Sequence, residues 1–322
     1  MSITRRSVLA AAPAATLGGS ALAQTQPQAQ TPGQAGEQPA FYRYRIGDIE
    51  VTAIHDGIGR RPLEGLVRNA PLDEVKKAME ERFLPTDVLP ITFTPLVLRT
   101  GGRTVVVDTG NGDSGAPTAG RFIPGLRAAG IDPKDVNTVV ISHFHGDHIN
   151  GLRLKDGTWV YPNAEILVPA PEWAFWMSDE RMNQAPDAMK GAFQNVRRVF
   201  GPVAKDVKQY EAGKEVAPGV AALAAHGHTP GHMGFTVGSG RDGMMIVSDI
   251  TNHPALFVRN PDWAAVFDMD ADQARQTRRR ILDQAAADRT RLAFFHAPFP
   301  ATGHVVKDGN RYEFVPIQWG VG

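Results

Sequence analysis

The chain has 322 residues, 42% of them apolar, with 34 basic and 34 acidic side chains and no cysteine. This length is ample for a sizeable buried core, in one large domain or two smaller ones. The balanced charge gives no overall field that would attract nucleic acid, and the lack of cysteine excludes disulfides, thiolate metal ligands and cysteine nucleophiles.

Residues 1–23 have the pattern of an export signal. Arg5-Arg6 precedes a weakly apolar, Ala-rich stretch, and Ala21-Leu22-Ala23 offers small residues for cleavage. The stretch is too short and too poor in large side chains to span a bilayer, so no stable membrane insertion is expected. This pattern predicts a twin-arginine signal peptide and a periplasmic or secreted protein. Residues 24–39 are predicted to be a flexible leader before a folded domain over 40–322.

The first half of this domain alternates strand and helix patterns. Residues 42–46 and 49–54 alternate like strands joined by a turn. Apolar residues over 72–83 are spaced as one face of a helix. Further predicted elements follow in the order strand 96–99, strand 104–107, helix 120–129 and strand 137–141.

The second half repeats the mixture, which favours an α/β protein of two mixed sheets with helices outside. The helix predicted over 271–289 has its arginines interpreted as a mostly solvated face, and the aspartates before it as caps. Those side chains are Arg275, Arg278, Arg279 and Arg280, and Asp268, Asp270 and Asp272. The other predicted elements are strands near 165–168, 220–225, 233–237, 244–248 and 292–295, and a helix over 186–199.

The densest chemical signal is His143-Phe144-His145-Gly146-Asp147-His148, directly after an apolar run. Imidazole and carboxylate are side chains that bind first-row divalent metals. On an extended strand His143, His145 and Asp147 would share one face, and His148 would point away. A loop that curls after the strand can bring all four inward, but only around more than one metal position. The segment therefore predicts a metal site rather than a chance cluster of polar residues.

Three further residues stand where a strand meets a loop. His232 ends a Thr-Pro-Gly-His turn that aims its imidazole, Asp249 follows the strand 244–248, and His296 follows the strand 292–295. Singly, each has an ordinary structural interpretation as a turn residue, a helix cap or a packed core histidine. Their recurrence together with the first cluster favours a functional role, because strand ends hold functional loops on a rigid scaffold.

In this combined order the chain resembles the metallo-β-lactamase superfamily, over essentially all of residues 41–319. The resemblance implies an αββα sandwich of two mixed β-sheets with outer helices, as a catalytic domain over 40–322. It also implies the ligands: His143, His145 and His232 for one metal, Asp147, His148 and His296 for the second, and Asp249 bridging the two. Asp108, in Val107-Asp108-Thr109-Gly110, would orient the first cluster without binding metal itself.

Several segments point to one branch of the superfamily: Phe41-Tyr42-Arg43, residues 47–52, residues 225–232, Gly303-His304 and Phe314-Val315-Pro316. In these segments the chain most closely resembles the methyl parathion hydrolase-like branch, which stands near the quorum-quenching lactonases. Trp176 and Phe193 fall where that branch places aromatic pocket residues, and His253 and His304 are further candidates for the pocket. A third pocket aromatic has no counterpart, because the loop 112–115 is small and polar. This difference argues against efficient phosphotriester hydrolysis.

The resemblance implies a hydrolase of small molecules that binds two divalent ions. Zinc is the expected metal, and manganese, iron and cobalt are the alternatives. A hydroxide bridging ions about 3.5–4 Å apart would attack a small ester, lactone or organophosphate. Asp147 and Asp249 are the carboxylates assigned to catalysis, with Asp147 assisting proton transfer to the leaving group. The alternatives are a β-lactam or thioester hydrolase, a diiron redox protein and a non-catalytic binding protein. A diiron protein is disfavoured because it would carry Glu at position 145, and a homodimer is expected from the resemblance alone.

Overall fold

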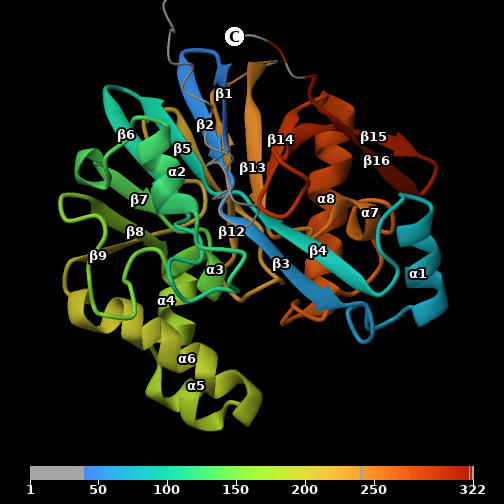
Figure 1. Cartoon of the computed structure of the whole chain (residues 1–322), viewed down its shortest axis with the longest axis horizontal. Coiled ribbons are helices and arrows are strands. Elements are labelled where there is room, and N and C mark those ends of the chain that lie inside the picture. Colours follow the sequence, from blue (N-terminus) through green and yellow to red (C-terminus); the bar gives the residue numbers. More distant parts are fainter. Residues whose placement is uncertain (1–39, 240–241, 319, 321–322) are drawn as a thin grey trace, which may run out of the picture. The chain divides into compact units, whose positions relative to one another are not determined.

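The computed structural model describes residues 40–239, 242–318 and 320, and two seven-stranded sheets dominate them. The predicted signal peptide and leader lie outside the described residues. In Figure 1, α2, α4 and α6 lie with β6 to β9 in one half of the view, and α8 lies with β14 to β16 in the other. This is the predicted αββα sandwich, and the prediction of the fold is confirmed.

The first sheet has the order β1-β2-β5-β6-β7-β8-β9. Its pairs are antiparallel as far as β6 and parallel from β6 to β9. Its strands are β1 (Phe41–Ile46), β2 (Ile49–Ile54), β5 (Leu96–Thr100), β6 (Arg103–Val107), β7 (Thr138–Val140), β8 (Glu165–Pro169) and β9 (Val207–Tyr210).

The second sheet has the order β10-β11-β12-β13-β14-β15-β16, in which only β13 and β14 are parallel. Its strands are β10 (Glu215–Ala217), β11 (Val220–Ala224), β12 (Met233–Val237), β13 (Met244–Ser248), β14 (Arg291–Phe294), β15 (Thr302–Asp308) and β16 (Arg311–Pro316).

Alternate residues of the central strands enter different cores. Val105 and Val107 of β6 point between the sheets, whereas Val106 joins the outer core under the helices. Met244 and Met245 of β13 divide in the same way between the inner core and the core beneath α8. Because both faces of each sheet are covered, these strands are continuous apolar runs rather than alternating ones.

The helices fill the outer layers and the connections between strands. No helix among the described residues has the length and apolar character needed to cross a bilayer. They are α1 (Leu72–Glu80), α2 (Phe122–Ala128), α3 (Gly146–Ile149), α4 (Ala170–Trp176), α5 (Asp179–Gln184), α6 (Asp187–Phe200), α7 (Pro254–Phe257) and α8 (Ala271–Asp288).

β3 (Gly57–Pro62) pairs antiparallel with β4 (Val88–Phe93) in a separate two-stranded sheet that the sequence patterns did not predict. We refer to this strand pair as the β3–β4 hairpin, although residues 63–87 with α1 connect its two strands. Its sequence in β3, Gly-Ile-Gly-Arg-Arg-Pro, lacks the β-branched alternation typical of strands. Side chains around the hairpin pack with α1 and α7 in a satellite core, in which Leu89 and Ile91 meet Leu256. Tertiary packing therefore stabilises this hairpin more than strand propensity does.

The topology brings several strand ends to one edge. β6 and β7 are parallel, with Val107 opposite Val140, so the segments that follow them leave the first sheet together. β13 and β14 are also parallel, and β12 begins beside the end of β13 because that pair is antiparallel. The predicted functional residues follow or precede these strands, so the fold gathers them at one place.

Candidate metal centre

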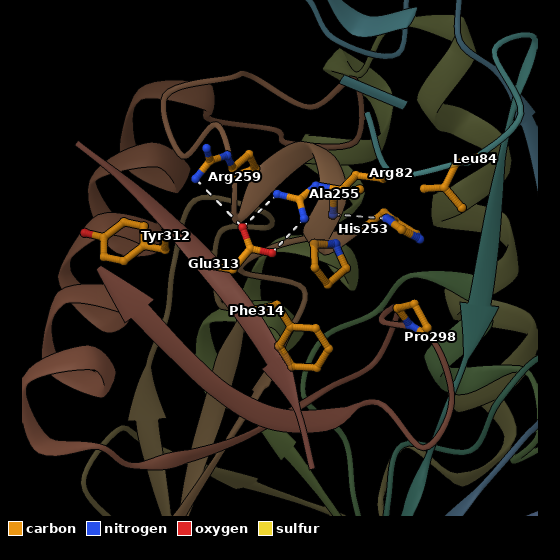
Figure 2. Close-up of a pocket in the computed structure, with 10 residues that line it drawn as sticks. Arg82, Leu84, His253, Ala255, Arg259, Pro298, Tyr312, Glu313 and Phe314 are labelled. Carbon is orange, nitrogen blue, oxygen red and sulfur yellow. Dashed lines mark hydrogen bonds and ion pairs between the residues drawn. The ribbon is translucent and has the colours of Figure 1, made fainter. Parts of the chain in front are cut away.

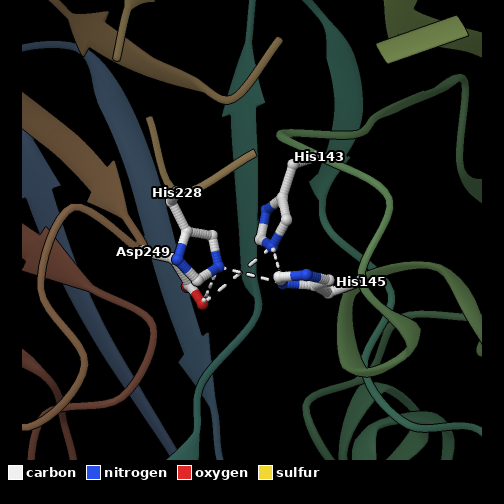
Figure 3. Close-up of side chains that lie close together, drawn as sticks. All are labelled: His143, His145, His228 and Asp249. Carbon is white, nitrogen blue, oxygen red and sulfur yellow. Dashed lines mark hydrogen bonds and ion pairs between the residues drawn. The ribbon is translucent and has the colours of Figure 1, made fainter. Parts of the chain in front are cut away.

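His143, His145, His228 and Asp249 form the first group of potential ligands (Figure 3). One ligand atom from each lies within 4.8 Å of the others. His145 Nδ1 is 3.1 Å from His143 Nε2 and 2.9 Å from His228 Nε2. Asp249 Oδ2 is 3.2 Å from His228 Nε2. Three imidazole nitrogens and one carboxylate oxygen therefore converge on one point.

Asp147, His148 and His296 form the second group, within the same 4.8 Å limit. Asp147 Oδ2 lies 3.6 Å from His148 Nε2 and 3.5 Å from His296 Nε2. Asp249 reaches this group as well, with Oδ1 at 3.4 Å from His148 Nε2 and Oδ2 at 3.0 Å from His296 Nε2. Asp249 therefore lies between the two groups, where a bridging ligand has to be.

The ring orientation of four of these histidines is fixed from behind. In each, Nδ1 faces an acceptor at 3.0 Å or less, so Nδ1 carries a proton and Nε2 is the ring nitrogen that faces the cluster and can bind a metal there. The pairs are His143 with Ser142 Oγ, His148 with Asp108 Oδ2, His228 with Asp268 Oδ1 and His296 with the carbonyl oxygen of Thr92. This is the arrangement that metal-binding histidines use.

Asp108 is placed behind the cluster rather than in it. Its Oδ1 accepts a hydrogen bond from the Ser142 backbone N–H, and its Oδ2 accepts from Ser142 Oγ and His148 Nδ1. The residue has φ +59°, a left-handed conformation that is uncommon for a side chain other than glycine. Such strain is found where the surroundings over-determine a conformation, and here it aims a carboxylate at a ligand.

His232 lies outside both groups, and its predicted role as a ligand needs correction. Its Nδ1 donates to the carbonyl oxygen of Ala225 at 2.8 Å, and its Nε2 accepts from the Asp249 backbone N–H at 3.1 Å. Both ring nitrogens are thus engaged, and no lone pair is left for a metal. His228, at the other end of the same Thr-Pro-Gly turn, supplies the third imidazole of the first group. His232 instead positions the backbone of Asp249.

Asp268 and Arg278 support His228 and were missed by the sequence patterns. Asp268 accepts from His228 Nδ1 through Oδ1 and from Arg278 Nη2, at 3.2 Å, through Oδ2. Arg278 is only 1% exposed, which corrects its assignment to a solvated face. Its other N–H groups donate to three backbone carbonyls, so the buried charge is fully paired. Asp270 is the aspartate that caps α8.

Glu172 of α4 ties together the two loops that carry the first group. It is fully buried, and its Oε1 accepts from the Gly231 backbone N–H at 2.7 Å. Its Oε2 accepts from the Phe144 backbone N–H at 3.0 Å and from Trp176 Nε1 at 2.8 Å. The carboxylate therefore fixes the spacing between the His143–His145 loop and the His228 loop.

The predicted pocket residues lie elsewhere. Trp176 of α4 and Phe193 of α6 are buried in the outer core, where they pack with other bulky apolar side chains against the first sheet. His304 is in β15, and its Nδ1 donates to the carbonyl oxygen of Arg289. His253 caps α7 and lines a smaller cavity of about 190 Å³ beside Arg82 and Glu313 (Figure 2). The structure therefore places none of these four residues in the wall of the cavity that opens onto the metal ligands.

A cavity of about 510 Å³ opens onto the metal ligands. The ligands His145, Asp147, His228, Asp249 and His296 form part of its wall. The remaining wall is mixed: apolar side chains from the β3–β4 hairpin and nearby loops, polar side chains, and two arginines. These residues include Ile91, Phe93, Ala116 and Phe267, then Asn111, Ser114, Asn150 and Asn252, then Arg60 and Arg61.

Burial and neighbouring charges divide the histidines into two classes. Burial and, after it, the charge of the neighbouring His228 lower the pKa of His145 to about 3. Burial also acts against protonated His228, but hydrogen bonds to Asp249 and Asp268 raise its pKa to about 9. His148 likewise has its pKa raised well above the usual value, because the carboxylates of Asp249, Asp108 and Asp147 outweigh burial.

Two polar atoms at the centre show that these residues fit cations. His148 Nε2 and Asp249 Oδ1 are buried and have no hydrogen-bond partner among the described residues. A buried polar atom without a partner is costly, on the order of 1–3 kcal/mol, and a bound cation would satisfy both atoms. Imidazole nitrogens with carboxylate oxygens are a donor set suited to zinc and to other first-row divalent ions.

Comparison with known proteins agrees with this geometry. The model of the metallo-beta-lactamase superfamily matches residues 95–296. An N-acyl homoserine lactonase from Bacillus sp is 24% identical over 183 residues, 51% of this chain and 65% of that protein. The chain thus matches slightly less than two thirds of that relative's length.

Two solved structures share the fold over most of the chain. AidC, a dizinc quorum-quenching lactonase in complex with a product, has a TM-score of 0.82 at 25% identity, over 88% of this chain and 99% of that one. AbOPH, a hydrolase of the beta-lactamase superfamily, has a TM-score of 0.81 at 24% identity, over 87% and 98%. The match of the family model over residues 95–296 confirms the predicted family, and the two structures agree with the predicted fold.

Replacing His228 and His232 separately tests the corrected ligand set. We expect His228→Ala to lower the metal content of the protein from about two ions to about one, because the first group loses an imidazole. His232→Gln should keep about two ions, because His232 donates no lone pair to the cluster. Metal content per folded protein, measured by plasma emission spectroscopy alongside circular dichroism, distinguishes the two. Loss of an ion from folded His232→Gln with retention in His228→Ala would contradict the assignment.

The raised pKa of His228 predicts that metal binding releases protons. With a pKa of about 9, His228 is protonated at neutral pH in the ion-free protein, and a metal must displace that proton. The affinity of the first group for zinc should therefore increase as the pH rises from 7 toward about 9. Calorimetry at pH 7 in buffers of different ionisation enthalpy measures the released protons. Binding heats that do not depend on the buffer would rule this linkage out.

Proposed function

The chain belongs to the metallo-beta-lactamase superfamily as a metal-dependent hydrolase, and we propose that it opens the ring ester of small lactones. The observation that carries the proposal is the position of Asp249, which contacts both ligand groups and lines the 510 Å³ cavity. The dizinc lactonase neighbour, with 99% of its chain covered, supports the substrate class.

The ligand groups suit ester chemistry without a side-chain nucleophile. When two divalent ions are bound close together, they lower the pKa of water and polarise a carbonyl oxygen. Asp249 holds the two groups at a fixed separation. Asp147 lines the cavity with 24% of its side chain exposed, so its carboxylate can return a proton to the leaving alkoxide. We propose this proton-transfer role for Asp147 in addition to metal binding.

The cavity favours a small substrate with an apolar part. Ile91 and Phe93 of β4 form an apolar wall, while Asn111 and Asn252 offer amide groups for a carbonyl or an amide. The predicted aromatic pair Trp176 and Phe193 lies in the core instead, so it adds nothing to the aromatic side chains of Phe93 and Phe267 in the cavity wall. A lactone with a short acyl chain therefore fits better than an organophosphate.

A substrate panel tests the proposal. Protein loaded with zinc should hydrolyse N-hexanoyl homoserine lactone with kcat/KM at least about tenfold above that for an aryl ester, a thioester, a phosphotriester or a β-lactam, a difference of about 1.4 kcal/mol. Chelation should abolish turnover, and His228→Ala serves as the matched ligand variant. Full activity after verified metal removal, or no turnover of any substrate, would sink the proposal. If the protein prefers the β-lactam or the thioester, the lactonase proposal is replaced by the corresponding alternative, a β-lactam or thioester hydrolase.

We further propose export through the twin-arginine pathway, which is supported by Arg5-Arg6 and the Ala21-Leu22-Ala23 segment. Replacing both arginines by lysine preserves the charge but removes the pair that the pathway recognises. The doubly substituted chain should stay in the cytoplasm at its full length, whereas the native chain should appear shortened in the periplasm. Cell fractionation with immunoblotting measures this, and an unchanged distribution speaks against export. The homodimer stays a prediction of the family resemblance.

A further inference from the structure

Arg60 and Arg61 of β3 line the cavity that contains the metal ligands. Both side chains are exposed, and neither guanidinium forms an ion pair or hydrogen bond with any described residue. Arg61 lies 5.9 Å from the centre of the Phe267 ring, which lines the same cavity and restricts where the guanidinium can lie. Two positive charges therefore face the substrate space without an internal partner.

The smaller cavity gives a contrasting case. There Arg82 donates two hydrogen bonds to Glu313, at 2.8 and 2.7 Å, and Arg259 pairs with Asp308 and approaches Glu313 (Figure 2). The arginines of that cavity are neutralised by the protein itself. Arg60 and Arg61 at the ligand cavity are not neutralised in this way by any described residue, so their charge can be paired by an anion from outside the protein.

The hairpin places the cations beyond an apolar wall. Gly59 pairs with Ile91 in the hairpin, and a side chain at Gly59 would meet the Phe93 ring at 3.0 Å. Phe93 in turn contacts the His296 ring, with centroids 5.5 Å apart. Because residues two apart on a strand share a face, Arg61 follows Gly59 on this face at about 6–7 Å, whereas the neighbouring Arg60 leaves β3 on the other face and borders the cavity from there. From the metal ligands outward, the wall therefore changes from aromatic to cationic.

Charge at the loaded site acts in the same direction. The positive charge of two bound divalent ions would exceed the negative charge of Asp147 and Asp249, the two carboxylates among the ligands that line the cavity. Arg60 and Arg61 add two further positive charges at its wall. Clefts lined by one sign of charge raise the local concentration and association rate of oppositely charged substrates.

We propose that Arg60 and Arg61 form a subsite for a carboxylate carried by the substrate, so that the protein prefers lactones or esters whose acyl chain ends in an anionic group. The scissile carbonyl would lie at the metal ligands, the chain along Phe93 and Ile91, and the carboxylate at the guanidinium groups. This inference rests on the proposed hydrolysis of lactones and names its substrate class.

Two N-acyl homoserine lactones of equal chain length test the subsite, one ending in a carboxylate and one in a methyl group. With zinc-loaded protein at low salt, kcat/KM should be about fivefold to tenfold higher for the carboxylate substrate, and screening at about 0.5 M salt should reduce this ratio. In Arg60→Gln/Arg61→Gln the ratio should fall toward one, through a higher KM for the carboxylate substrate. Arg60→Lys/Arg61→Lys should retain part of the preference.

Arg82→Gln is the matched control, because it removes a guanidinium that Glu313 already pairs, at the other cavity. It should leave the ratio as in the native chain. Turnover of both substrates with a ratio near one, or a ratio that the double glutamine variant does not change, overturns the subsite while lactone hydrolysis stands. No turnover of either substrate by the metal-loaded protein overturns both the subsite and the proposed function.

Discussion

The metal centre depends on hydrogen bonds that the histidines make on the side away from the ligands. Four imidazoles have Nδ1 engaged, so each has only Nε2 left for the cluster. The acceptors come from separate parts of the chain: Ser142 after β7, Asp108 after β6, Asp268 before α8 and Thr92 in β4. The ligand geometry is therefore a property of the assembled sandwich and not of the histidine-rich segment alone.

The supporting groups are themselves held by buried charge. Asp268 is paired with Arg278, and Glu172 holds two loops through backbone N–H groups. Burying carboxylates and a guanidinium is costly unless every group is paired, and removing one partner leaves an uncompensated charge. The ligands are thus kept in place by interactions that contribute little net stability but tolerate few alternative arrangements. Two of the described buried polar atoms without a hydrogen-bond partner, His148 Nε2 and Asp249 Oδ1, lie between the two ligand groups, where a cation would satisfy them.

The sequence could predict the parts of the site that are set by local spacing. The segment 143–148 and the strand ends before Asp249 and His296 are local patterns, and the structure brings these residues together. The choice between His228 and His232 is not local, because it depends on Asp268, 40 residues beyond His228, and on the Asp249 backbone. Likewise Trp176 and Phe193 carry no sign of which sheet face they cover. The β3–β4 hairpin could not be predicted, because β3 has little strand propensity and the pair is stabilised by packing with α1 and α7, of which α7 is distant in sequence from both strands.

The β3–β4 hairpin lines the substrate cavity but contributes no metal ligand. Its residues pack in a satellite core with α1 and α7, whereas the ligands are held by the strand ends of the two large sheets. It touches the centre where Phe93 contacts the His296 ring and where the Thr92 carbonyl oxygen accepts a hydrogen bond from His296 Nδ1. Residues on the opposite strand, including Arg60 and Arg61, face the cavity without supporting any ligand. Substitutions in β3 can therefore change which substrates bind while the catalytic geometry stays fixed, since loops and edges on a rigid scaffold vary at little structural cost.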